Sequence, residues 1–113
     1  MKQYLLLLRG GLNFATATAE QIQEAMMMWK TWMDDLIQQG KMKPGHRLMK
    51  VGKVLTGKRK EMTDGPYSEG KEIVGGYLIV IANSLDEATE LALGCPIFNY
   101  DGSVEVREII VEA

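Results

Sequence analysis

One carboxylate stands at a stiff corner of the chain, where it could take part in chemistry. Asp64 precedes Gly65 and Pro66 in the segment D-G-P-Y-S-E-G-K-E, which runs directly into the most apolar stretch. Proline fixes its own φ and biases the residue before it to extended backbone, so the corner gives Asp64 little freedom. Asp64 could serve a ligand as acid, base or hydrogen-bond acceptor. It could equally accept hydrogen bonds from nearby amides and only stabilise the turn.

A second candidate group is the adjacent pair His46 and Arg47. His46 is the only histidine in the chain, and it follows Pro44-Gly45. Histidine is the side chain that ordinarily titrates near neutral pH, so His46 is a candidate for proton exchange and, with Asp64, for a catalytic pair. It could also be a solvated loop residue. Arg47 is a candidate for binding an anionic ligand.

Three aromatic side chains are candidates for ligand binding. Trp29 and Trp32 lie three residues apart, so they are neighbours on the surface of the predicted helix. The methionines around them offer an adaptable surface, which suits small-molecule binding but also ordinary core or dimer packing. Tyr67 could donate a hydrogen bond to a ligand oxygen, or pack over a sheet edge with its hydroxyl in water.

Composition excludes several kinds of site. With one cysteine, Cys95, and one histidine, a single chain can form neither an internal disulfide nor a His/Cys metal cluster. The Gly-Gly pairs at 10–11 and 75–76 do not fit a dinucleotide or P-loop spacing, so no nucleotide cofactor is predicted. The apolar run 5–8 is too short for a secretory signal or a membrane span, and we expect a cytoplasmic protein.

Positive charge is concentrated in one window of the sequence. The formal net charge is −2, but residues 41–60 contain eight basic side chains and no acidic one, which leaves −10 for the remainder. Such a surface could recognise an acidic protein or another anion, or it could be an inert solvated face. Nucleic acid is a weaker alternative, because the window has no aromatic side chain to stack on a base and the chain is acidic overall.

The first half of the chain predicts a strand and a helix. Residues 3–9 are apolar on both faces and are followed by Gly10-Gly11, as expected of an interior strand. Thr18 and Gln21 have the form of a capping box, so a helix should begin there. Its apolar residues recur every three or four positions, and Gly40 lies just past its expected end near Gln39.

The second half predicts a hairpin, a strand, a helix and a last strand. Residues 47–63 alternate irregularly and reverse near 56–58, which indicates a two-stranded basic hairpin. Residues 77–82 are apolar and rich in β-branched side chains, as in a central strand. A second capping box, Ser84 with Glu87, begins a helix that ends at Gly94. Residues 103–112 begin with the alternation of a strand with one wet face.

The order of elements indicates an α+β fold. If one leg of the hairpin joins the sheet, the order is that of the ferredoxin-like split β-α-β fold, with an antiparallel sheet and two helices on one face. The other face is left bare, so a second copy is expected to cover it in a homodimer. The 113 residues suffice for one domain, 1–113.

Three segments, residues 63–80, 84–92 and 102–108, resemble successive blocks of the YCII-related family. They read T-D-G-P-Y-S-E-G-K-E-I-V-G-G-Y-L-I-V, S-L-D-E-A-T-E-L-A and G-S-V-E-V-R-E, and the D-G-P motif indicates the DGPF-motif branch. The resemblance spans nearly the whole chain. It implies a ferredoxin-like fold that forms a dimeric α+β barrel, with a pocket between sheet and helices.

The family resemblance leaves the function open. Some members are proposed to be small enzymes with a His-Asp pair, and related domains occur beside extracytoplasmic-function sigma factors. Here Tyr67 replaces the usual Phe, and Met28 or Trp29 stands where the proposed enzymes carry His, so the pair is not carried over intact. We expect a dimeric small-molecule-binding protein or small enzyme with its pocket near Asp64. The alternative is a non-catalytic regulatory or interaction module that uses the basic hairpin within 41–60, and the resemblance implies a link of this module to sigma-factor signalling.

Overall fold

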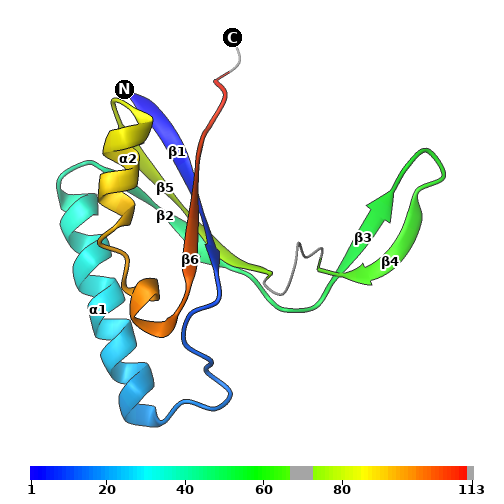
Figure 1. Cartoon of the computed structure of the whole chain (residues 1–113), viewed down its shortest axis with the longest axis horizontal. Coiled ribbons are helices and arrows are strands. Elements are labelled where there is room, and N and C mark those ends of the chain that lie inside the picture. Colours follow the sequence, from blue (N-terminus) through cyan, green and yellow to red (C-terminus); the bar gives the residue numbers. More distant parts are fainter. Residues whose placement is uncertain (67–72, 112–113) are drawn as a thin grey trace.

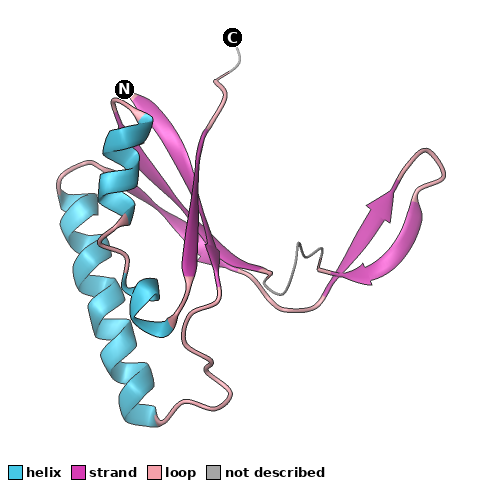
Figure 2. Cartoon of the chain, viewed as in Figure 1, coloured by secondary structure: helices cyan, strands magenta, loops and turns pink. Residues whose placement is uncertain are grey.

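A computed structural model describes residues 1–66 and 73–111. Four strands form an antiparallel sheet in the order β2-β5-β1-β6, and β3 and β4 form a separate two-stranded sheet. Both helices lie on one side of the larger sheet (Figures 1 and 2). The predicted α+β class and split β-α-β order are confirmed. The elements are β1 (Lys2–Arg9), α1 (Ala19–Gln38), β2 (Met42–Arg47), β3 (Gly52–Thr56), β4 (Glu61–Gly65), β5 (Val74–Ala82), α2 (Leu85–Ala92), the 3-10 helix η1 (Pro96–Tyr100) and β6 (Ser103–Glu108).

The second strand of the larger sheet is not the one that the sequence predicted. We expected a leg of the 47–63 hairpin to fill this place, but β2, which ends at Arg47, pairs with β5, and both legs of the hairpin lie outside this sheet. β2 contains Pro44, which has no amide hydrogen to donate and is tolerated because β2 is an edge strand. Its sequence, M-K-P-G-H-R, has no apolar alternation, so periodicity could not reveal it.

The core lies between the sheet and the two helices. Strand side chains alternate between faces, and the helix-facing residues Tyr4 and Leu6 of β1 and alternate residues of β5 from Gly76 to Ala82 are buried. Tyr4, Leu6 and Val80 are the largest fully buried side chains. The buried core cluster consists of Tyr4, Leu6, Leu36, Met42, Leu78, Val80, Ala82, Ala88 and Ala92.

The helix starts follow from their capping residues. At α1 the Thr18 hydroxyl accepts from the Gln21 amide at 3.1 Å, and the Gln21 side chain accepts from the Thr18 amide at 2.9 Å, so the predicted capping box is complete. At α2 the Ser84 hydroxyl accepts from the Glu87 amide at 3.1 Å. The Glu87 carboxylate accepts from the Asn83 amide instead, so only half of the second predicted box forms.

The opposite face of the sheet has no helix over it in the part of the chain that the structure describes (Figure 2). Alternation places the residues between the core positions on this face. On the two central strands these include Leu5, Leu7, Ile79 and Ile81, each only partly buried. The sheet therefore presents a band of aliphatic side chains that a second layer could cover.

The hydroxyl of Tyr4 is the buried side-chain oxygen that has no hydrogen-bond partner among the described residues. We predict that Tyr4→Phe is at least as stable as the wild type, because the substitution keeps the ring and removes an unsatisfied polar group from the core. Urea unfolding measures this. Leu6→Ala, which should lower the free energy of unfolding by about 2–5 kcal/mol, shows that the assay senses this core. A clear loss of stability in Tyr4→Phe would mean that the hydroxyl has a partner.

Candidate ligand-binding site

A cavity of about 380 Å³ lies between α1 and the sheet. Small-molecule pockets commonly measure about 300–1,000 Å³, so this one suits a compact ligand. Four segments meet at it besides α1: the end of β1 with the loop after it, the end of β2, the start of β5, and η1. They bring together Leu8, Gly10, Gly11, Leu12, Phe14, Ala25, Met26, Trp29, Met33, Gly45, His46, Arg47, Gly75, Gly76, Tyr77, Leu78, Ile97 and Tyr100.

Gly45 makes the sheet side of this cavity possible. β2 bulges against β5 between Lys43 and His46, and a Cβ added to Gly45 would lie 1.7 Å from the carbonyl oxygen of Tyr77. No side chain fits there. A β-bulge re-aims the residues that follow it. Here it sets His46 opposite Tyr77 and Arg47 opposite Gly76.

His46 and Tyr77 form a polar pair at the cavity. The His46 Nδ1 and the Tyr77 hydroxyl are 2.7 Å apart, and either one donates according to the tautomer of the ring. Tyr77 alternates with the core residue Leu78, so the pair borders the cavity from the face that no helix covers. A phenol joined to an imidazole can hold a proton or pass it to a neighbouring oxygen.

Arg47 supplies positive charge at the same place. Its guanidinium carbon lies 4.7 Å from the centroid of the Phe14 ring, a cation–π contact that holds the group beside an aromatic wall. No carboxylate within residues 1–66 or 73–111 pairs with Arg47. Trp29 and Tyr100 add further aromatic surface. The arrangement suits a planar ligand that carries negative charge.

The structure places the predicted site residues in different parts of the molecule. Trp29, His46 and Arg47 line the one cavity. Asp64 lies on β4, in the separate hairpin, where its side chain is 88% exposed and pairs with Lys53 at 2.5 Å. Because β4 pairs with β3 rather than with the larger sheet, the structure does not join His46 and Asp64 within one chain. Tyr67 lies outside the described residues.

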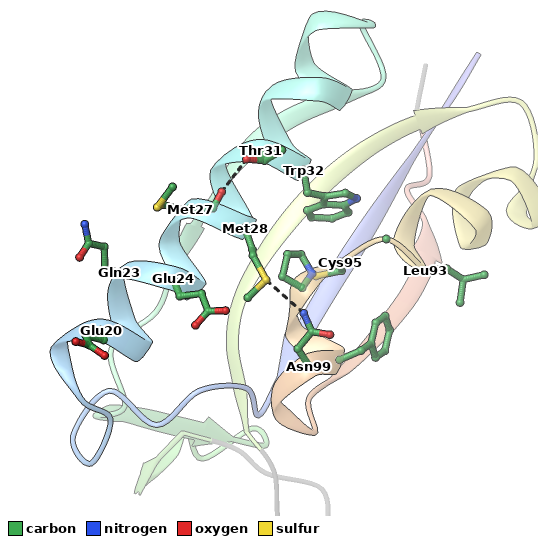
Figure 3. Close-up of a pocket in the computed structure, with 13 residues that line it drawn as sticks. Glu20, Gln23, Glu24, Met27, Met28, Thr31, Trp32, Leu93, Cys95 and Asn99 are labelled. Carbon is green, nitrogen blue, oxygen red and sulfur yellow. Dashed lines mark hydrogen bonds between the residues drawn. The ribbon is translucent and has the colours of Figure 1, made fainter.

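Trp32 borders a second hollow, an open groove of about 810 Å³ between α1 and the segment 93–99 (Figure 3). The ring centroids of Trp29 and Trp32 are 5.8 Å apart, and the two rings meet edge to face. Residues three apart on a helix differ by about 60° around its axis, which is enough for neighbours to face different hollows. The sequence had suggested that the two tryptophans line one pocket, but each of them borders a different hollow.

Sequence reasoning missed the partners that complete the cavity. Phe14 and Tyr100 come from a loop and from η1, which carry no periodic pattern. Tyr77 was predicted only as part of a strand, and its pairing with His46 depends on the bulge at Gly45. The one available signal was the Gly75-Gly76 pair before Tyr77, because glycines in a strand often mark close approach of another backbone.

The chain belongs to the YCII-related family, because the YCII-related domain matches residues 4–112. Among solved structures it is similar to the 5-chloro-2-hydroxyhydroquinone dehydrochlorinase from Burkholderia phenoliruptrix AC1100, in complex with 2,5-dihydroxybenzoquinone. The TM-score is 0.51 at 16% sequence identity, over 96% of this chain and 93% of that one. At this identity the likeness shows the fold alone, which is the predicted ferredoxin-like one. The comparison with curated proteins found no significant match.

Among the described residues, no helix combines the length and apolar character that a membrane crossing requires.

The close approach at Gly45 predicts that Gly45→Ala is destabilising. The added methyl group collides with the backbone of β5 and should lower the free energy of unfolding by about 1–3 kcal/mol, as measured by urea unfolding. Gly75→Ala is the matched control, because a Cβ there would have its nearest neighbour, the Leu8 carbonyl oxygen, at 3.9 Å. Equal stability of the two variants would show that β2 does not need the bulge.

Burial raises the pKa of the Cys95 thiol to about 11. Since the thiolate is the reactive form, iodoacetamide at pH 8 should modify the native protein on the order of 100-fold more slowly than the urea-unfolded chain, whose thiol titrates near 8.5. The folded pKa is the higher one, so the thiol's contribution to stability is complete below about pH 8.5 and is lost as the pH rises towards 11. Mass spectrometry follows the labelling. Rapid native labelling would contradict the burial of Cys95.

Proposed function

We propose that this protein is a dimeric small-molecule-binding protein whose cavity between α1 and the sheet takes a compact, planar anion. The observation that carries the proposal is the Arg47 guanidinium beside the Phe14 ring in a cavity with further aromatic walls. A guanidinium binds a carboxylate or an enolate oxygen with charge-assisted hydrogen bonds, while the rings contact the flat face of the ligand. A neutral ligand of the same shape would use only half of this arrangement.

The proposal extends to acid–base chemistry at the bound ligand. His46 is hydrogen-bonded to Tyr77 on the uncovered face, where the ends of β2 and β5 meet the cavity, so the pair is placed to exchange a proton with a ligand oxygen that reaches this edge of the sheet. In the similar dehydrochlorinase the bound molecule is 2,5-dihydroxybenzoquinone, a compact, planar compound with acidic hydroxyl groups. That ligand is a reasonable first probe for this chain. Asp64 and Tyr67 stay predictions as site residues, as does membership of the DGPF-motif branch.

The dimer in this proposal follows from the uncovered sheet face. Leu5, Leu7, Ile79 and Ile81 form an aliphatic band there, and an apolar band on a sheet is stabilised when a second layer removes it from water. A second copy offers a self-complementary layer with two-fold symmetry. The His46–Tyr77 pair lies on the same face, so the partner would also shield it from solvent.

Ligand binding is tested with two anions, 2,5-dihydroxybenzoquinone and benzoate, and with the neutral benzamide. We predict that both anions raise the melting temperature at millimolar concentration by mass action, and that benzamide does not. Arg47→Met should weaken anion binding at least about 10-fold in titration calorimetry, because it removes the cation and keeps an apolar stem. Lys50→Met, which removes a neighbouring cation outside the cavity, is the matched control. The proposal fails if neither anion stabilises the wild type, or if Arg47→Met binds both as the wild type does.

A further inference from the structure

The β3–β4 hairpin stands apart from the rest of the molecule. Its strands pair only with each other, and the described residues provide no other element in extended contact with them. Figure 1 shows it on the side of the larger sheet that faces away from α1 and α2. A lone two-stranded hairpin is at best marginally stable in water, so this one should have a surface to lie against.

The surface of the hairpin is that of a docking element. Leu55 and Met62 are cross-strand partners, so they share one face, and they are 62% and 64% exposed. The turn that joins the strands carries Lys58, Arg59 and Lys60. Residues 50–65 have five basic and two acidic side chains, a net +3. The hairpin thus combines an apolar face with a basic tip.

The complementary surface is on the helical side of the same chain. α1 carries four acidic residues and one lysine, and α2 carries three acidic residues and no basic one, a net −6 for the two helices. The groove beside Trp32 runs between α1 and the segment 93–99, with Glu20 and Glu24 along it (Figure 3). No basic group within the described ranges pairs with either glutamate.

The groove is apolar between its polar edges. Met27, Leu93 and Phe98 line it and are 64%, 61% and 44% exposed. Three large apolar side chains gathered in one hollow with an acidic edge are typical of a protein-binding surface. An element with aliphatic side chains and a basic end would match both features.

We infer that the β3–β4 hairpin is an arm that clasps a second copy of this chain and lies in the groove of that copy. Leu55 and Met62 cover the apolar floor, and Lys58 and Lys60 meet the partner's Glu20 and Glu24. In the arm's own chain, α1 and the segment 93–99, which border the groove, lie across the sheet from the arm (Figure 1), so the fitting groove is that of a neighbour. The arm also projects on the side of the uncovered sheet face, where the second copy of the proposed dimer sits.

The exchange is reciprocal, since each copy gives an arm and receives one, which closes the assembly as a two-fold dimer. The inference rests on the dimer of the proposed function, but it concerns a different surface from the ligand cavity. It also names a partner for the basic residues of the hairpin. The sequence suggested that they recognise an acidic protein, and in this inference that protein is a second copy of the chain.

Charge reversal on each surface tests the arm. The arm variant is Lys58→Glu with Lys60→Glu, the groove variant is Glu20→Lys with Glu24→Lys, and sedimentation equilibrium at about 50 mM salt, where screening is weak, gives the dimer dissociation constant. Each variant alone should raise this constant at least about 10-fold, because like charges then face each other. An equimolar mixture should recover the wild-type constant, because both contacts in the mixed dimer again join opposite charges.

The control variant is Asp86→Lys with Glu90→Lys, which makes the same charge change on α2 outside the groove and should leave the dissociation constant unchanged. Circular dichroism checks that each variant keeps its helices, and recovery in the mixture shows that both chains are folded. A wild type that stays monomeric at every concentration would overturn both the dimer and the arm. A dimer that ignores both reversals, or one that weakens without recovery in the mixture, would overturn the arm alone.

Discussion

The backbone of β2 passes so close to that of β5 that position 45 has no room for a side chain. This contact sets the geometry of the candidate site. The bulge at Gly45 turns His46 towards Tyr77 and Arg47 towards Phe14. Gly45, Gly75 and Gly76 line the cavity where it meets the sheet. The chemistry proposed for the cavity therefore depends on a glycine whose own side chain takes no part in it.

Local sequence patterns predicted most of the fold. The parts that they did not predict depend on contacts between segments that are distant in the sequence. The interior strands, both helix starts and the hairpin turn follow from periodicity, capping and turn residues that are close in sequence. β2 escaped because Pro44 and Gly45 break any alternation, and its place is set by pairing with β5. The same holds for the site. Trp29, His46 and Arg47 were recognised by residue type. Tyr77 lies beside His46 only because of the register between β2 and β5, and Asp64 lies outside the cavity because it belongs to the separate hairpin.

The molecule keeps its functions on different surfaces. The cavity between α1 and the sheet has aromatic walls and a volume of about 380 Å³, which suits a small ligand. The bare sheet face is aliphatic, the hairpin is basic, and the helical face is acidic, and the proposed dimer would use all three. Charge is thus separated across a chain whose net charge is only −2. A separation of this kind favours association with a copy turned by a two-fold axis.

The central claim is that a planar anion binds in the cavity beside Trp29 rather than in the groove beside Trp32. Tryptophan fluorescence separates the two, because Trp32→Phe leaves only Trp29 as reporter, and Trp29→Phe leaves only Trp32. Titration with 2,5-dihydroxybenzoquinone should quench the Trp32→Phe variant saturably and quench the Trp29→Phe variant far less. Saturable quenching confined to the Trp29→Phe variant, or none in either, would contradict the account.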